Sequence, residues 1–150
     1  MSDVRPPGEI ARQRRRGDAI CVGDEATLEE GPELLKLLMQ PFGGASFPLG
    51  RGIHPMTTVP LGLAIDAAIE AAGGYDLEVT TLRYCTFTME GPTSNRRPLR
   101  ATARIVEIGP RHVEAEAEVW ERERLILRTR IGLVRVRGGR AVSLADRTVQ

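Results

Sequence analysis

Lysine, cysteine and histidine are scarce in this sequence. Lys36 is the only lysine among 21 basic residues, so arginine carries almost all of the positive charge. The two cysteines, Cys21 and Cys85, are too few for a disulfide framework and have no metal-ligand spacing. The two histidines, His54 and His112, have no cysteine or acidic residue paired with them at ligand spacing. We therefore predict that the chain has no metal site.

Long apolar runs and an excess of charge of one sign are also missing. The most apolar stretch, residues 61–72, is interrupted by Asp66 and Glu70, which excludes a membrane span. The net charge of +1 gives no long-range field for binding nucleic acid. No apolar signal segment opens the sequence, so we expect a cytoplasmic protein that binds neither nucleic acid nor membrane.

The composition is that of one globular domain. A chain of 150 residues, 41% hydrophobic and 27% charged, buries roughly two thirds of the surface that the unfolded chain exposes. Residues 1–17 have no apolar periodicity and are rich in arginine, which predicts a disordered basic arm. We expect the single folded domain to span residues 18–137, followed by a loose polar tail over residues 138–150.

One long helix stands out in the first half of the folded domain. Residues 61–72 are nearly all apolar, which predicts a helix that is buried on most sides. We expect Thr57 or Thr58 to cap this helix, Pro60 to lie in its first turn, and Gly73 to end it. Ahead of it, the sequence predicts an edge strand over residues 19–22, a short helix over residues 33–39 and a loop over residues 43–58.

The second half of the domain has the alternating pattern of half-buried strands. Apolar and polar residues alternate with period two, and Gly, Pro or charged turns separate the segments. Glutamates of one strand then face arginines of its neighbours, which predicts a cross-strand charge ladder on a solvent-exposed face. The order of elements indicates an α+β fold, with one long helix packed on a strongly curved antiparallel sheet. The expected strands are residues 77–89, 99–105, 113–119 and 125–133.

The strand sequences carry a resemblance to a known family. They are VTTLRYCTF at 79–87, PLRATARIV at 98–106 and GPRHVEAEAEV at 109–119. With the preceding helix, residues 54–136 resemble hotdog-fold acyl-CoA thioesterases of the branch typified by the phenylacetate-pathway enzyme. This resemblance implies a curved antiparallel sheet wrapped around one long central helix. It also implies a homodimer or a dimer of dimers, with the active site between protomers.

The entry to the helix departs from that branch. Its members usually have His-Gly-Gly before the helix, whereas this sequence has His54-Pro55-Met56, and Asp66 is the nearest following acid. The arrangement of His54, Pro60 and Asp66 instead resembles the helix entry of hotdog dehydratases. The resemblance as a whole therefore implies an acyl-thioester substrate and leaves hydrolysis and dehydration open.

The candidate catalytic residues lie on the helix and at its start. Asp66 sits in the middle of an apolar helix, where a carboxylate either finds partners or has its pKa raised, and both suit acid–base chemistry. Glu70 is one turn further on and is a secondary candidate. His54 lies where the loop meets the helix. The backbone N–H groups of Met56 and Thr57 are the candidate oxyanion donors.

Three functions remain open from the sequence. The leading hypothesis is an acyl-thioester hydrolase in which Asp66 activates water or acts as the nucleophile and His54 orients the carbonyl. The first alternative is a dehydratase, hydratase or conjugate-addition enzyme that uses His54 as base and Asp66 as acid. The second is a non-catalytic hotdog protein that binds acyl thioesters.

The family resemblance also implies how the substrate's carrier is held. Turn arginines often contact the phosphates of coenzyme A in hotdog proteins, which makes Arg96, Arg97 and Arg111 the candidates here. We expect no cofactor other than the coenzyme A or phosphopantetheine that forms part of the substrate. An acyl carrier protein is accordingly a candidate partner.

Overall fold

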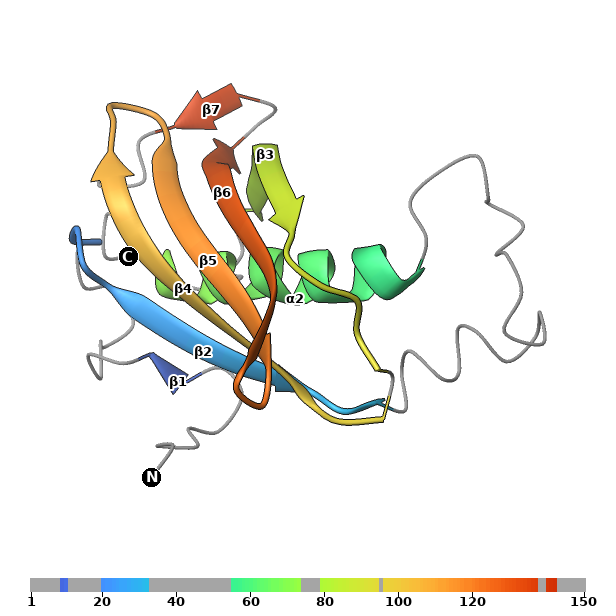
Figure 1. Cartoon of the computed structure of the whole chain (residues 1–150). Helices are drawn as coiled ribbons and strands as arrows, with labels where there is room; N and C mark the ends of the chain where they lie inside the picture. Colours follow the sequence, from blue (N-terminus) through green and yellow to red (C-terminus); the bar gives the residue numbers. More distant parts are fainter. Residues whose placement is uncertain are drawn as a thin grey trace.

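The computed structural model describes residues 9–10, 20–32, 55–73, 79–94, 96–137 and 140–142. Seven strands and one long helix lie within these residues (Figure 1). Their bounds are β1 Glu9–Ile10, β2 Glu25–Glu30, α2 Pro55–Ala71, β3 Val79–Met89, β4 Leu99–Ile108, β5 Val113–Glu121, β6 Arg124–Arg137 and β7 Arg140–Val142.

The strands form one antiparallel sheet that curves over α2. The strand order is β1-β2-β4-β5-β6-β3, and β7 pairs with β6 off this path. In Figure 1, β4, β5 and β6 curve across the helix, which runs behind them. The chain forms β1 and β2 at one edge of the sheet, passes through α2, and returns at the far edge with β3. This confirms the predicted α+β fold, with a curved antiparallel sheet around one long helix.

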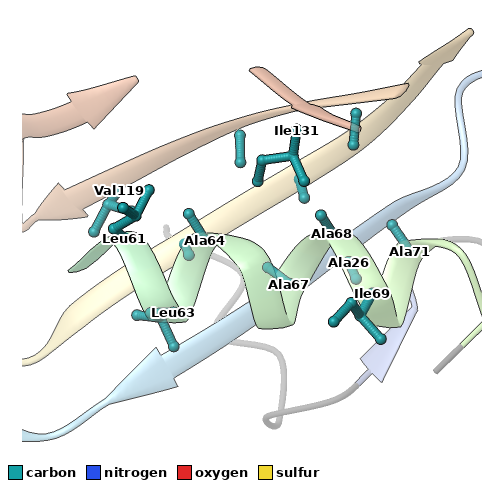
Figure 2. Packing of buried hydrophobic residues seen from close by; sticks show 14 of the residues in the cluster. Ala26, Leu61, Leu63, Ala64, Ala67, Ala68, Ile69, Ala71, Val119 and Ile131 are labelled. Carbon is teal, nitrogen blue, oxygen red and sulfur yellow. The ribbon is translucent and has the colours of Figure 1, made fainter. Parts of the chain in front are cut away.

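The helix and the sheet meet through alanines. Ala64, Ala67 and Ala68 of α2 are fully buried, as are the alanines on the facing side of the strands. Figure 2 shows the helix alanines directed toward the sheet, with Ala26 of β2 beside them. Methyl groups on both surfaces let the backbones approach closely, and larger apolar residues close the core around them. These larger residues are Leu61, Leu63, Ile69, Ile105, Val119, Leu127, Ile131 and Leu133.

The helix starts earlier than the sequence indicates. It begins at Pro55, so Thr57 and Thr58 lie within the first turn instead of capping it. Pro60 lies inside the helix, beyond the first turn, which makes the predicted position of this proline wrong. A proline is well suited to the first helical position because it lacks the N–H that would have no partner there, and Pro55 fills this position. The predicted end is confirmed: Gly73 has a φ of 107° and its N–H donates to the Glu70 carbonyl at 3.0 Å.

The predicted edge strand over residues 19–22 is wrong, because a turn lies where that strand should end. The Asp24 carboxylate accepts the Cys21 N–H at 2.9 Å, and Gly23 has a φ of 94°. The strand that the structure has here, β2, begins just after this turn. It pairs with β4, and its first residue, Glu25, lies opposite Arg104. Ala26 is its only fully buried residue, so its polar sequence gave no apolar signal.

Two short strands lie in segments that were expected to be loose. Residues 9–10 form β1 and pair with β2, inside the expected arm over residues 1–17. Residues 140–142 form β7 and pair with β6, inside the expected tail over residues 138–150. The predicted helix over residues 33–39 and most of the loop over residues 43–58 lie outside the described residues. The three-segment division stays a prediction.

The four predicted strands after the helix are confirmed as β3 to β6. The charge ladder across them is confirmed as well: Arg128 lies 3.6 Å from Glu118, and Arg130 lies 3.6 Å from Glu116. Arg130 also pairs with Glu114, and this carboxylate raises the pKa of the guanidinium further above its usual range. These ion pairs are exposed, so they neutralise charge on the outer face and add little stability.

Two glycines, one within α2 and one just after its end, predict opposite effects of adding a methyl group. We expect Gly73→Ala to lower the free energy of unfolding by about 1 kcal/mol, because alanine is strained at the positive φ that ends the helix. We expect Gly62→Ala to raise it by about 0.5–1 kcal/mol, because a Cβ there meets open space and alanine favours the helix. Urea denaturation of both variants measures the difference. A destabilised Gly62→Ala would contradict an open surface at this position.

Candidate active site and arginine groove

One stripe of α2 is not covered by the sheet. Thr58, Gly62, Asp66 and Glu70 recur every four residues and so share one face of the helix. Thr58 and Asp66 are exposed, whereas Gly62 and Glu70 are half-buried. The prediction that the helix is buried on most sides is therefore confirmed, with this stripe as the exception. Both candidate carboxylates project from it.

The environment of Glu70 suits a group that holds a proton. Its partial burial raises its pKa, and the nearby charge of Asp66 raises it further. The two carboxylates lie one helical turn apart, where like charges repel. Glu70 therefore keeps its proton to higher pH than an ordinary glutamate, beside an exposed Asp66. The sequence placed Glu70 second, and its burial could not be seen without the fold.

The oxyanion candidates lie at the other end of the helix from the carboxylates. Met56 and Thr57 are in the first turn of α2, where backbone N–H groups have no partner within the helix. The ten positions from Met56 to Asp66 correspond to about 15 Å along the helix axis. One chain thus does not bring these donors and the carboxylates together. His54, the remaining candidate, lies outside the described residues.

A groove rich in arginine opens at the end of the sheet where β4 begins. Its cavity of about 1220 Å³ is lined by the β3–β4 connection and by the turn between β5 and β6. Arg96 and Arg97 line it, and Arg100, Arg122 and Arg124 join them. Sequence reasoning missed the last three because they come from separate segments. The two-residue turn that follows Glu121 was the one signal that they would project from the sheet's end.

Arg111 lies elsewhere. It is exposed in the turn between β4 and β5, whereas Arg96 and Arg97 precede β4. The ten residues of β4 separate these turns, which corresponds to about 30 Å. The structure therefore brings two of the three predicted phosphate-binding arginines together and leaves the third at the opposite end of the strand.

A buried glutamate ties the two walls of the groove together. Glu121 is 4% exposed, and its carboxylate accepts the backbone N–H of Ser94 at 2.9 Å as well as the Ser94 hydroxyl. Arg124 lies 3.5 Å from the same carboxylate. Burial alone would raise the pKa of Glu121, but the hydrogen bonds from Ser94 and the charges of Arg124 and Arg97 outweigh it and lower the pKa.

Edge strand β3 exposes large apolar side chains. Leu82, Tyr84 and Phe87 are 37%, 39% and 38% exposed. Phe87 pairs with Thr129 and Leu82 with Leu133, so both point to the helix side of the sheet. The Tyr84 ring lies against Gly132 on the outer side, where its hydroxyl donates to Glu114.

The described part of the chain has neither a group of metal ligands nor a membrane-spanning helix. No group of three or more His, Cys, Asp or Glu residues among the described positions could hold a metal ion. No helix within the described ranges is long and apolar enough to span a membrane.

The chain matches no protein-family model and no curated protein sequence. Among solved structures it is similar to a mutant of the fluoroacetyl-CoA-specific thioesterase FlK, with 14% identity and a TM-score of 0.61 over 79% of this chain and 90% of that one. It is also similar to a Thermus thermophilus protein described as a thioesterase superfamily member, with 20% identity and a TM-score of 0.54 over 78% of this chain and 84% of that one.

An enzyme of a different reaction has the same architecture. R-hydratase PhaJ1 from Pseudomonas aeruginosa is similar over 75% of this chain and 80% of its own, with 16% identity and a TM-score of 0.55. FlK has also been solved in complex with fluoroacetate and CoA, and that structure covers 77% of this chain with a TM-score of 0.60. Together with the strand order and the central helix, these similarities show that the chain has the hotdog fold.

The bonds between Glu121 and Ser94 predict an acid-sensitive groove wall. We expect Glu121→Gln to lower the free energy of unfolding at pH 7 by about 1–3 kcal/mol, because charge-assisted hydrogen bonds are lost. The pKa of Glu121 is lower in the folded protein than in the unfolded chain. Its contribution to the stability of the wild type is therefore complete above the pKa of the unfolded chain, and it is lost as the pH falls through the pKa of the folded protein.

The free energies of unfolding of the wild type and of Glu121→Gln should therefore converge below about pH 4.5, the ordinary pKa of a glutamate. Denaturation at several pH values tests this, and Glu123→Gln serves as the control because Glu123 is an exposed glutamate in the same turn. Equal pH dependence in wild type and Glu121→Gln would contradict the role of Ser94.

Proposed function

We propose that the protein is an acyl-thioester hydrolase that acts on acyl-CoA or on an acylated carrier protein. The observation that carries the proposal is the pair of carboxylates, Asp66 and Glu70, on the uncovered stripe of the central helix. The hotdog fold supports it, because thioesterases are among the similar structures, and FlK has been solved with CoA bound.

The chemistry needs a base, an oxyanion site and a leaving thiolate. Asp66 takes a proton from water as the water oxygen attacks the thioester carbonyl carbon, and His54 orients that carbonyl. Backbone N–H groups of Met56 and Thr57 stabilise the oxyanion that forms. When the intermediate collapses, the C–S bond breaks and the thiolate takes the proton from Asp66. Glu70, whose pKa is raised by burial and by the charge of Asp66, lies one helical turn from the base on the same stripe.

A second copy of the chain completes this site. The helix separates Asp66 from the first-turn donors, so the acid of one protomer works with the oxyanion donors of its partner. Edge strand β3 is the surface that fits this pairing, because its outer edge is open in the sheet order and it exposes Leu82, Tyr84 and Phe87. The protein is therefore a homodimer, or a dimer of such dimers, with its active sites between protomers.

A hydratase or dehydratase is the second candidate. The positions of His54, Pro60 and Asp66 favour it, and PhaJ1 has the same architecture. In this reaction His54 is the base and Asp66 the acid, so water is added or removed without loss of the thiol. Mass spectrometry of acyl-CoAs incubated with the protein distinguishes free thiol, a change of one water, and binding alone, the last of which would indicate a non-catalytic acyl-thioester-binding protein.

The oligomeric state is the first test. We expect sedimentation to give at least twice the 16.4 kDa of one chain at micromolar concentration. Phe87→Asp should shift the protein toward monomer and abolish hydrolysis, because the charge would be buried in the interface. Val22→Asp is the control, since Val22 is 63% exposed in a turn away from β3. A wild-type monomer, or equal dissociation of both variants, would contradict this interface.

Substitution of the carboxylates is the second test. Asp66→Asn should lower turnover of the best thioester by about 10²-fold or more, the usual scale for a lost general acid or base. Stability should hold or rise, because repulsion from Glu70 is relieved. Glu70→Gln should have a smaller effect on turnover. If Asp66→Asn keeps near-full turnover and Glu70→Gln is inactive, the base is Glu70, one helical turn further on, and the assignment to Asp66 is wrong.

The ratio between two variants separates the reactions. His54→Ala should be intermediate if the enzyme hydrolyses thioesters, because the His then only orients the carbonyl. It should be as severe as Asp66→Asn if the enzyme adds or removes water, because both groups then transfer protons.

A further inference from the structure

Gly62 lies inside α2, where a glycine makes a helix less stable than an alanine would. Its backbone is helical, so it needs no positive φ, in contrast to Gly23 and Gly73. A Cβ at Gly62 would meet no heavy atom of the described residues within 4 Å, whereas a Cβ at Gly132 would clash with the Tyr84 ring. Neither backbone geometry nor packing within the described residues therefore requires a glycine at this position.

The open space at Gly62 adjoins the candidate base. Gly62 and Asp66 are one turn apart on the uncovered stripe, about 6 Å along the helix axis. Side chains of an α-helix lean toward its N-terminus, so the Asp66 side chain leans over the turn that contains Gly62. A group that reacts beside the Asp66 carboxylate therefore lies against the backbone of Gly62, where no side chain takes up room.

The flanks of this space are apolar. Val59 and Ile65 lie three residues to either side of Gly62 and are its neighbours on the helix surface. Val59 is buried, and Ile65 is partly buried and packs against the core. An apolar group placed over Gly62 thus has two aliphatic side chains to contact and no side chain beneath it. This suits the acyl part of a thioester better than its amide-containing pantetheine arm.

We propose that Gly62 sets the acyl specificity of the site, by leaving room for an acyl group that is bulky next to its carbonyl carbon, such as a branched or an aromatic one. This inference rests on the proposed function, because that function places the thioester beside Asp66. Bulk on the α-carbon needs space within one helical turn of the base, and the missing Cβ at Gly62 provides that space. The helix gives up stability at Gly62 in return for substrate fit.

A second copy of α2 fits this space less well than a substrate does. Two helices that cross at Gly62 about a two-fold axis would bring Asp66 of one copy toward Asp66 of the other, with Glu70 one turn further on. Like charges repel, and the repulsion grows as water is excluded from between them. The charges on the stripe therefore favour a substrate, and not a second helix, as the group that covers Gly62.

Two isomeric acyl-CoAs test the proposal, because isobutyryl-CoA is branched at the α-carbon and butyryl-CoA is not. We expect Gly62→Ala to lower kcat/KM for isobutyryl-CoA about ten-fold or more relative to butyryl-CoA, the scale on which one methylene group changes specificity. Gly62→Ala should at the same time be more stable than the wild type in urea, which shows that turnover is not lost through unfolding.

Gly91→Ala is the matched control. It also adds one methyl group, in ordinary contact with the Leu125 carbonyl oxygen at 3.7 Å, and should leave the ratio of the two substrates as it is. An unchanged ratio in Gly62→Ala would overturn the proposal, and so would an equal change in Gly91→Ala. Lost stability of Gly62→Ala, or dissociation of its oligomer on sedimentation, would also overturn it and would assign the space to a second copy of the chain.

Unreactive analogues separate this inference from the proposed function. In the ketone analogues of both substrates a methylene group lies between the sulfur and the carbonyl carbon, so water cannot release the thiol. Calorimetry measures their affinities, and Gly62→Ala should weaken binding of the branched analogue about ten-fold more than binding of the straight one.

Selective weakening without turnover of any thioester would overturn the proposed function and leave the role of Gly62 standing. Turnover that depends on Asp66, with no change of selectivity in Gly62→Ala, would overturn the role of Gly62 alone. Absence of both turnover and binding would overturn both.

Discussion

The contact between alanines of α2 and alanines of the strands is the constraint on which the rest of the structure depends. Ala67 and Ala68 of α2 are fully buried, as are Ala103 of β4 and Ala115 of β5, and all four belong to one core cluster. An added methylene in such a core typically costs about 1–3 kcal/mol. The close approach lets the sheet curl around the helix and leaves one stripe uncovered, and that stripe carries the candidate carboxylates.

Some arginines of the outer face of the sheet lie opposite glutamates and others do not, and the strand register determines which. Along β5 and β6, Glu116 lies opposite Arg130, so the charges cancel strand by strand. At the end of the sheet the pairing stops, and Arg122 projects from the turn without a cross-strand glutamate. A near-neutral chain can therefore carry a positive groove, because glutamates of the outer face pair with arginines of the charge ladder.

Much of the fold followed from local pattern, whereas the start of α2, strand β2 and the groove did not. Period-two alternation and Gly or Pro turns fixed β3 to β6, and the Gly73 stop followed from the need for a positive φ. Strand β2 was missed because it has no apolar pattern of its own and is defined by its pairing with β4. The groove around Trp120 was missed for the same reason, since its walls come from separate segments. On the helix, Asp66 and Glu70 were visible as acids, but their exposure and burial depended on the curvature of the sheet.

Glu70 occupies a position on α2 that is unfavourable for a charged carboxylate. It is half-buried, it lies one turn from a like charge, and it occupies the last turn of the helix, where the macrodipole disfavours a negative charge and the helix has no basic residue. Each of these effects opposes ionisation, and none contributes to packing. Local conflict of this kind is expected at functional positions, where stability is given up for chemistry. This conflict supports our proposal that the protein acts at the stripe of Asp66 and Glu70.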